Sequence, residues 1–369
     1  MLLRVAILGG DGIGPEVTGE AVRVLKGVAE SFGHQLSLTH KDVGGAALRS
    51  SNDPLPKDTL ETCQSSDAVL LGAVGSPDFD HVPSNRRPEK GLLRLRQALG
   101  VFANLRPAFC FAPLEDCSPL RAEVVRGTDI LFVRELLGGI YFGEPRLTEG
   151  AIGSRTATDT MRYGENEIER VAHVAFQLAR TRRCKVTSVD KANVLDCSRL
   201  WRDVVSRVGQ QYSDIQLKHM YVDSAATALV SHPRDFDVIL TENMFGDILS
   251  DQAGGIVGSL GMLPSASVGG PVALYEPVHG SAPDITGKGI ANPLGAILSI
   301  AMMLRHSFQL DREAACVGAA VTDVLTAGHR TRDLASPGQT SIGTAEMGQK
   351  VVEAVQARAR ATGPMAVAR

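Results

Sequence analysis

Short aliphatic runs alternate with longer segments of helical periodicity along most of this chain. Residues 4–8 form an apolar run bounded by glycines, and residues 15–32 carry apolar side chains at helical spacing. The same criteria predict further strands at 68–71, 185–189, 217–222, 236–240 and 272–274, and further helices at 91–99, 165–180, 293–306, 312–327 and 343–358. This alternation predicts an α/β fold whose sheet is at least partly parallel.

Composition excludes several classes of function. The chain has 369 residues, of which 44% are hydrophobic and 21% charged, as in an ordinary globular protein of one or two domains. A net charge of −3 and an aromatic content of 5% predict no nucleic-acid or membrane partner. The longest apolar run, near 293–304, is too short to cross a bilayer. The six cysteines lack metal-binding spacing, and the N-terminus lacks a signal-peptide pattern, so we expect a reduced, cytoplasmic protein.

One segment interrupts the alternation of strands and helices. Residues 141–161 are polar and β-prone and contain several glycines. A long stretch without secondary structure is unusual inside a compact domain. We therefore expect a protruding hairpin arm that pairs with another subunit, with a plain loop as the alternative.

Two carboxylates, Asp247 and Asp251, stand four residues apart in a predicted helix and thus share one face. Their repulsion costs about a few tenths of a kcal/mol unless a partner neutralises it. An all-oxygen ligand pair suits Mg²⁺ or Mn²⁺ better than Zn²⁺. The alternative is a pair of solvated acids, but the neighbouring side chains are apolar and expected to be buried: Phe245, Ile248 and Leu249. We expect the glycines at 254–255 to end this helix.

A glycine-rich segment at 9–16 joins the first strand to the first helix. The third glycine of a dinucleotide-binding G-x-G-x-x-G pattern would fall on Pro15, and no G-K-[ST] sequence completes a Walker A loop. We expect a tight turn, although its glycines would also allow a ligand to approach the backbone closely.

Charged side chains lie at or near the ends of several predicted strands and helices. Four arginines from three segments stand in or beside apolar runs: Arg94, Arg96, Arg106 and Arg134. Each could form an internal salt bridge, or the four could converge on a ligand carboxylate. Lys191 follows a predicted strand, where α/β folds bind ligands, and it is either a base or an ordinary surface lysine.

A long loop rich in glycine and proline, at 275–293, connects a predicted strand with a predicted helix. Loops of this length usually bind a ligand. It carries His279, which is more often structural, together with Asp284 and Asn292. An acid facing an adenosine ribose would accept hydrogen bonds from its hydroxyls and repel a 2′-phosphate.

Eight segments, taken together and in this order, resemble the isocitrate/isopropylmalate dehydrogenase family of β-decarboxylating dehydrogenases. They are residues 9–16, 89–96, 102–107, 133–143, 189–194, 221–223, 243–251 and 276–292. The resemblance runs from the first strand to about residue 358. It implies a two-domain, non-Rossmann α/β fold with a protruding dimerisation arm at about 141–161. The terminal domain would comprise 1–101 and 258–369 and carry most of the NAD site. Residues 102–257 would form an inserted central domain with the dimer interface.

The resemblance also implies an activity: NAD-dependent and Mg²⁺- or Mn²⁺-dependent oxidative decarboxylation of 3-isopropylmalate in leucine biosynthesis, by a homodimer with shared active sites. Tyr141 would be the proton donor, and Lys191 of the partner subunit would take the hydroxyl proton. Substrate contacts are implied for Arg96, Arg106, Arg134, Asp223, Leu92, Leu93 and Val194. Metal ligands are implied to be Asp247, Asp251 and, from the other subunit, Asp223. Cofactor contacts are implied for Glu276, His279, Gly280, Ser281, Ala282, Pro283, Asp284, Ile285 and Asn292.

Other functions remain open at this point. A D-malate, tartrate or homoisocitrate dehydrogenase would share the fold, and a non-catalytic nucleotide-binding subunit is a further alternative. Leu92 and Leu93 favour a substrate with an aliphatic γ-substituent, but one methylene group separates two substrates by only ~1–3 kcal/mol. The chain departs from common family residues at Leu137, where threonine is usual, and at Cys197 and Thr227. Of these, Leu137 is the one expected to alter packing near Tyr141.

Overall fold

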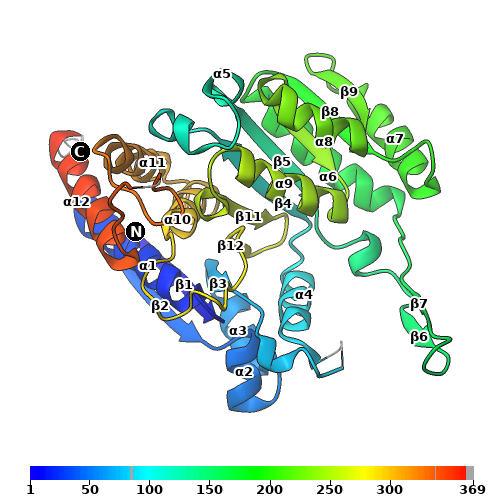
Figure 1. The fold of residues 1–369 in the computed structure, drawn as a ribbon, viewed down its shortest axis with the longest axis horizontal. Helices are drawn as coiled ribbons and strands as arrows, with labels where there is room; N and C mark the ends of the chain where they lie inside the picture. The colour runs from blue at the N-terminus through cyan, green and yellow to red at the C-terminus, as the bar shows by residue number, and fades with distance from the viewer. Residues whose placement is uncertain (84–85, 337, 363–369) are drawn as a thin grey trace.

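A ten-stranded mixed sheet runs through the molecule in the computed structural model, which describes residues 1–83, 86–336 and 338–362 (Figure 1). In spatial order its strands are β2 (Gln35–Lys41), β1 (Leu2–Gly10), β3 (Ala68–Ala73), β12 (Ala273–Pro277), β11 (Pro264–Val268), β4 (Ala103–Phe109), β5 (Asp129–Glu135), β10 (Val238–Thr241), β8 (Lys185–Asp190) and β9 (Gln216–Tyr221). Neighbours are parallel except where β11 pairs with β12 and β4, and where β4 pairs with β5. The predicted α/β fold with a partly parallel sheet is confirmed.

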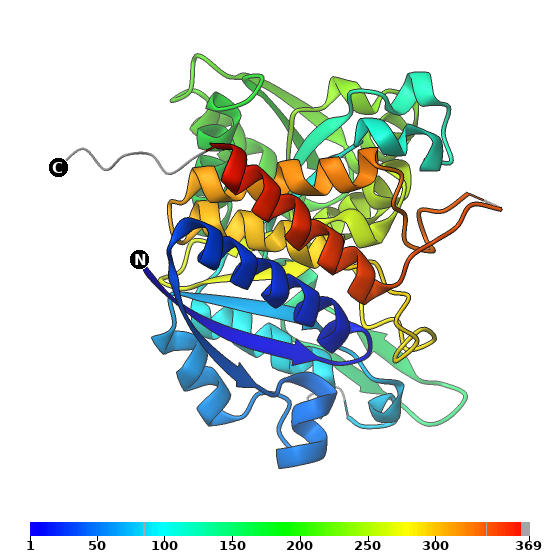
Figure 2. The ribbon, with the colours of Figure 1, turned by 90° about the vertical axis from the view of Figure 1, so that its left-hand side faces the viewer.

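Helices pack on both faces of this sheet, as alternate residues of its strands show. Leu3, Val5 and Ile7 of β1 belong to one apolar cluster, whereas Ala6 and Leu8 belong to another on the opposite face. The helices are α1 (Gly14–Phe32), α2 (Gly44–Ser51), α3 (Lys57–Ser65), α4 (Pro88–Leu99), α5 (Ala122–Val125), α6 (Glu165–Arg180), α7 (Asp196–Gly209), α8 (Val222–Ser231), α9 (Asn243–Ile256), α10 (Leu294–His306), α11 (Asp311–Thr326) and α12 (Thr344–Thr362). In Figure 2, α12 lies between α1 and α11. Within the described ranges, no helix is long and apolar enough to span a membrane.

Each half of the sheet corresponds to one of the two predicted domains. The five strands from β2 to β11 come from residues 1–101 and 258–369, and the five from β4 to β9 come from residues 102–257. The two sets meet where β11 pairs with β4, with Ala266 opposite Leu105. The sheet is therefore continuous across the predicted boundary, and the division into two domains stays a prediction.

The segment that interrupts the pattern contains a hairpin. Strands β6 (Leu147–Glu149) and β7 (Thr156–Thr158) pair antiparallel, and both are exposed. Figure 1 shows them standing away from the body of the molecule, and Ile152 between them is 90% exposed. The hairpin is confirmed and the plain loop is excluded, whereas its pairing with another subunit stays a prediction.

Two details of the helix α9 differ from the sequence analysis. The helix continues through Gly254 and Gly255 to Ile256, because neither glycine takes the positive φ of a helix-ending conformation. Gly254 instead allows close packing, since a Cβ there would lie 2.8 Å from a side-chain atom of Leu260. Phe245 is buried as expected, but Ile248 is 59% exposed because it lies on the face of α9 turned away from the core.

Candidate active site

The predicted metal-binding helix starts immediately after a buried strand. Glu242 follows β10 and caps α9, because its carboxylate accepts hydrogen bonds from the backbone N–H groups of Met244 (3.0 Å) and Phe245 (2.8 Å). The helix therefore begins at the carboxyl end of the strand. Two turns of α9 then carry Asp247 and Asp251 alongside β4 and β5.

Two guanidinium groups meet the carboxylates on α9. Arg106 Nη1, from β4, lies 3.1 Å from Asp247 Oδ1 and 3.1 Å from Asp251 Oδ1. Arg134 Nη1, from β5, lies 2.5 Å from Asp247 Oδ1. Both arginines are buried, so the alternative of two freely solvated acids does not hold. Asp251 keeps an exposed side, at 49% of its side-chain surface.

The other two arginines differ from each other. Arg96 on α4 donates to Glu276 on β12 at 2.8 Å, in a buried pair, and its charge also acts on Asp247 and Arg134. Arg94 does not converge with them, because it points outward and pairs with Asp53 at 2.6 Å near the surface. Three of the four arginines thus surround one site, and the fourth forms a local salt bridge.

Tyr141 contacts the same carboxylate from a different element. It ends the short helix η4 (Gly139–Tyr141), and its Oη donates to Asp247 Oδ2 at 2.8 Å. The guanidinium of Arg134 lies 5.6 Å from the centre of its ring. Burial, followed by the charge of Asp247, raises the pKa of the phenol to about 12. Tyr141 therefore carries its proton at neutral pH.

The charges of this cluster set the ionisation of its members. Burial alone would raise the pKa of Asp247, but Arg134 and Arg106 outweigh it and hold that pKa below its usual range. Burial raises the pKa of Asp251, because Arg106 offsets only part of the desolvation. Burial, and then the charge of Arg106, lowers the pKa of Arg134 to about 10. Arg134 stays cationic at neutral pH and Asp247 stays anionic.

Lys191 and Asp223 form a second, separate pair. Lys191 Nζ lies 3.2 Å from Asp223 Oδ2, because β8 and β9 are parallel neighbours and both residues follow the carboxyl ends of these strands. Asp223 has 64% of its side chain exposed, and Val194 close by is also exposed. Within the described part of the chain no three His, Cys, Asp or Glu side chains are grouped to hold a metal. Asp223 therefore lies apart from Asp247 and Asp251 in one subunit.

The loop between β12 and α10 surrounds a cavity of about 690 Å³. Five of the predicted cofactor residues line it: His279, Ala282, Asp284, Ile285 and Asn292. The sequence analysis missed Ser259, Gly261, Arg332 and Asp333, which also line it, together with Ile13 of the glycine-rich turn and Lys288, Ile290 and Ala291 of the loop. Asp333 accepts from Asn292 Nδ2 at 3.0 Å, so the missed segment holds a predicted cofactor residue in place. The four other predicted residues do not line it: Glu276 pairs with Arg96, and on the loop Gly280 and Pro283 are exposed and Ser281 is half-buried.

The glycine-rich turn after β1 supports this loop. Ile13 N donates to Ser281 O at 2.8 Å, and Gly287 N donates to Glu16 Oε1 at 2.6 Å. Gly12 has φ +57°, and a Cβ there would lie 1.9 Å from Ser281 O, so only glycine fits. The expected tight turn is confirmed.

Comparison with known proteins agrees with this geometry. The sequence profile described as isocitrate/isopropylmalate dehydrogenase matches residues 4–351. The chain belongs to this dehydrogenase family. It is 56% identical over 351 residues to the 3-isopropylmalate dehydrogenase of Moorella thermoacetica, covering 95% of this chain and 98% of that protein. It is 52% identical over 350 residues to the 3-isopropylmalate dehydrogenase of Aquifex aeolicus, covering 95% and 96%.

A solved structure extends the likeness to the fold. The isocitrate dehydrogenase of Methylococcus capsulatus superimposes with a TM-score of 0.85 at 34% identity, over 96% of this chain and 99% of that one. The family and the isopropylmalate dehydrogenase-like α/β fold expected from the sequence are therefore confirmed.

The donor set of this family member fits a hard divalent cation. Asp247 and Asp251 stand one helical turn apart and offer only oxygen, and Asp251 is half exposed. Two carboxylates are fewer ligands than Mg²⁺ or Mn²⁺ requires, so further oxygens must come from a substrate, from water or from another subunit. The exposed Asp223 has the chemistry to serve as one of them.

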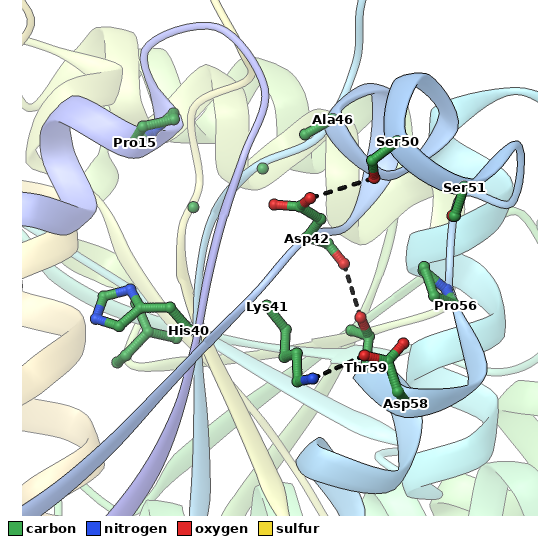
Figure 3. Close-up of a pocket in the computed structure, with 13 residues that line it drawn as sticks. Pro15, His40, Lys41, Asp42, Ala46, Ser50, Ser51, Pro56, Asp58 and Thr59 are labelled. Atoms are coloured by element: carbon green, nitrogen blue, oxygen red, sulfur yellow. Dashed lines mark hydrogen bonds and ion pairs between the residues drawn. The ribbon is translucent and has the colours of Figure 1, made fainter.

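A second pocket, of about 600 Å³, lies between the ends of β1 and β2 and the helices α2 and α3 (Figure 3). Its polar groups bond to one another: Lys41 Nζ lies 2.7 Å from Asp58, and Thr59 Oγ1 donates to Asp42 O at 2.9 Å. None of the predicted site residues lines it. We assign it no chemistry.

Proposed function

We propose that this chain is an NAD-dependent 3-isopropylmalate dehydrogenase, which converts 3-isopropylmalate to 4-methyl-2-oxopentanoate and CO₂ in leucine biosynthesis. The observation that carries the proposal is the convergence of Arg106, Arg134 and Tyr141 on Asp247. Relatives that bear this enzyme name and are 52–56% identical over almost the whole chain support it.

The arginines supply recognition of a dicarboxylate. Arg106 and Arg134 are buried cations beside the carboxylates of α9, and Arg96 approaches from α4. Guanidinium groups bind carboxylates through paired N–H donors, so the three can grip both acid groups of a malate. Leu92 and Leu93 lie on the same helix as Arg96 and are half-buried, which places an aliphatic surface beside the arginine. This neighbourhood suits the isopropyl group.

Two side chains move protons. Lys191 of the partner subunit, in its neutral amine form, takes the proton of the C2 hydroxyl through a water molecule as the alcohol is oxidised. After CO₂ leaves, Tyr141 donates its proton to the enol carbon, which its raised pKa of about 12 permits because the phenol is protonated beforehand. Asp247 accepts the hydrogen bond of Tyr141 and so fixes the direction of the phenol.

The cofactors would be held by groups already described. Asp247 and Asp251, with Asp223 of the partner subunit, would hold Mg²⁺ or Mn²⁺. Asp284, in the 690 Å³ cavity, would accept hydrogen bonds from the ribose hydroxyls of NAD. When bound, NAD supplies the electron acceptor and the cation polarises the alcohol and the ketone formed from it.

A homodimer would complete the site. Three large apolar side chains are exposed on or directly before α8 and on α9: Tyr221, Val230 and Ile248; Val194, between β8 and α7, is also exposed. A buried interface would remove this surface from water, and α8 and α9 are neighbours. The same contact would bring the Lys191–Asp223 pair of one subunit toward Asp247 and Asp251 of the other. The hairpin β6–β7 would pair with its counterpart.

A substrate panel tests the proposal. We expect the purified protein with NAD and Mn²⁺ to prefer 3-isopropylmalate in kcat/KM over D-malate, tartrate and homoisocitrate. A clear preference for D-malate or homoisocitrate would assign it to a different member of the fold. Absence of NADH formation with every substrate would favour the non-catalytic alternative.

A further inference from the structure

Two asparagines are fully buried beside the substrate-binding arginines. Asn104 lies on β4 and Asn243 is the first residue of α9. Each accepts hydrogen bonds from one guanidinium group, and neither residue was singled out by the sequence analysis. A hydrogen bond from a buried guanidinium to a buried amide oxygen is strong, and its loss leaves a buried polar group unpaired at a cost in free energy.

Asn243 connects Arg134 with the turn that carries Tyr141. Its Oδ1 accepts from Arg134 Nε at 3.0 Å and from Nη2 at 2.7 Å. Its Nδ2 donates to Gly138 O at 3.0 Å, immediately before the helix of Tyr141. A guanidinium can only donate, so the amide oxygen must face Arg134 and the amide nitrogen must face Gly138. The orientation of the amide is therefore fixed.

Asn104 makes the corresponding contacts for Arg106. Its Oδ1 accepts from Arg106 Nε at 2.8 Å, and its Nδ2 donates to Ser267 Oγ at 2.9 Å on the neighbouring strand β11. The same constraint on donors fixes the direction of this amide. Arg106 is thus tied to a strand of the terminal half of the sheet, whereas Arg134 is tied to the base of the arm.

The amide of Asn243 leaves some of the N–H donors of Arg134 for other groups. Asn243 occupies the Nε side of Arg134, while the two terminal nitrogens each carry a further N–H beyond the bonds to Asn243 and Asp247. Arg134 already faces the carboxylate of Asp247, so a further carboxylate in place of the amide would add a negative charge that opposes binding of an anionic substrate. A neutral acceptor aims the guanidinium without adding that charge.

We propose that Asn104 and Asn243 are positioning residues that aim Arg106 and Arg134 at the substrate carboxylates. The inference rests on the proposed function, because it assigns the two arginines to the substrate. It adds two residues that do not touch the substrate themselves and act through the arginines.

Four variants test it, with kinetics on the best substrate of the panel. Asn243→Ser and Asn104→Ser remove the amide, and Asn243→Asp keeps its shape but adds a charge. Thr59→Val is the control: it removes a buried hydrogen bond near β2, in the pocket of Figure 3 and outside the site. We expect each asparagine variant to raise the substrate KM about 10- to 100-fold while the NAD KM stays within about twofold. Thr59→Val should leave both constants near wild type.

A double-mutant cycle separates positioning from general stability. If Asn243 acts through Arg134, the substitution Asn243→Ser should add little once Arg134→Lys is present. Additive losses, equal rises in the two KM values, or an unchanged substrate KM in Asn243→Asp would overturn the proposal. Wild-type turnover on the panel is measured first, so a failed proposed function appears there as inactivity, before any variant is compared.

Discussion

Tyr141 donates a hydrogen bond to Asp247, so the predicted proton donor and a predicted metal ligand are in direct contact at 2.8 Å. The same carboxylate receives Arg106 and Arg134. One aspartate therefore contacts the proposed proton donor and two of the proposed substrate-binding arginines.

The substitution Tyr141→Phe tests the proton donor. We expect kcat to fall about 10²- to 10⁴-fold with little change in the substrate KM, because the ring still packs near Arg134 while the acid is lost. Steady-state kinetics measure this. A large change in KM with kcat unaltered would contradict the role.

Removing one carboxylate from α9 tests the metal site. Asp251→Asn should lower kcat/KM roughly a hundredfold or more and increase the Mn²⁺ concentration required for half activity. Activity is titrated against Mn²⁺ in the variant and in Asp203→Asn, a control at an exposed acid on α7. Near-wild-type activity of Asp251→Asn at low Mn²⁺ would show that Asp251 is not a ligand.

Mixed dimers test whether active sites are shared. Lys191→Met and Asp251→Asn should each be nearly inactive alone. In a co-expressed mixed dimer, one site would combine intact Lys191 with intact Asp251, and the other would carry both substitutions. We expect activity to reappear in the mixed species isolated by two affinity tags. If it stays as low as in the parent variants, Lys191 serves its own subunit.

Much of this site was predictable because its chemistry is local. Asp247 and Asp251 could be read as a pair because four residues separate them on one helix. The sequence left open which arginines converge, because that depends on long-range contacts. Arg94 and Arg96 are neighbours in sequence, and only the packing of α4 on β12 turns Arg96 inward toward Glu276. Ile248 was expected in the core, but helical periodicity does not say which apolar positions face a second subunit or solvent.

The sequence analysis missed one edge strand and the two buried asparagines because their sequence patterns are weak. The strand β2 (Gln35–Lys41) alternates polar and apolar residues at the edge of the sheet, so it lacks a continuous apolar run. The asparagines Asn104 and Asn243 carry no charge, and their value comes from partners distant in sequence, such as Ser267 and Gly138. Such residues become visible only when the fold gives their hydrogen bonds.

Cofactor choice is tested at the loop before α10. Asp284→Ala removes the acid expected to repel a 2′-phosphate, and Lys288 and Arg332 line the same cavity. We therefore expect the ratio of kcat/KM for NAD to that for NADP to fall by about tenfold or more. Kinetics with both cofactors measure the ratio. An unchanged ratio would remove the basis for assigning Asp284 to the ribose.

Stability should depend on pH through Glu135, which is fully buried between Arg134 and the arm. Burial raises its pKa to about 7, although the N–H groups of Leu137 and Gly138 partly offset this. The native state then binds a proton that the unfolded chain releases near pH 4.5, so this contribution to stability is complete below pH 4.5 and is lost as the pH rises to about 7.

We accordingly expect the free energy of unfolding to fall between pH 5 and pH 7.5 by a few kcal/mol at most from this group, roughly 1.4 kcal/mol per unit of pKa difference. Glu135→Gln should flatten that dependence, because it cannot ionise. Urea unfolding at a series of pH values measures the slope, and Asp203→Asn, at an exposed acid on α7, is the control. A slope equal in Glu135→Gln and wild type would show that other groups carry the pH dependence.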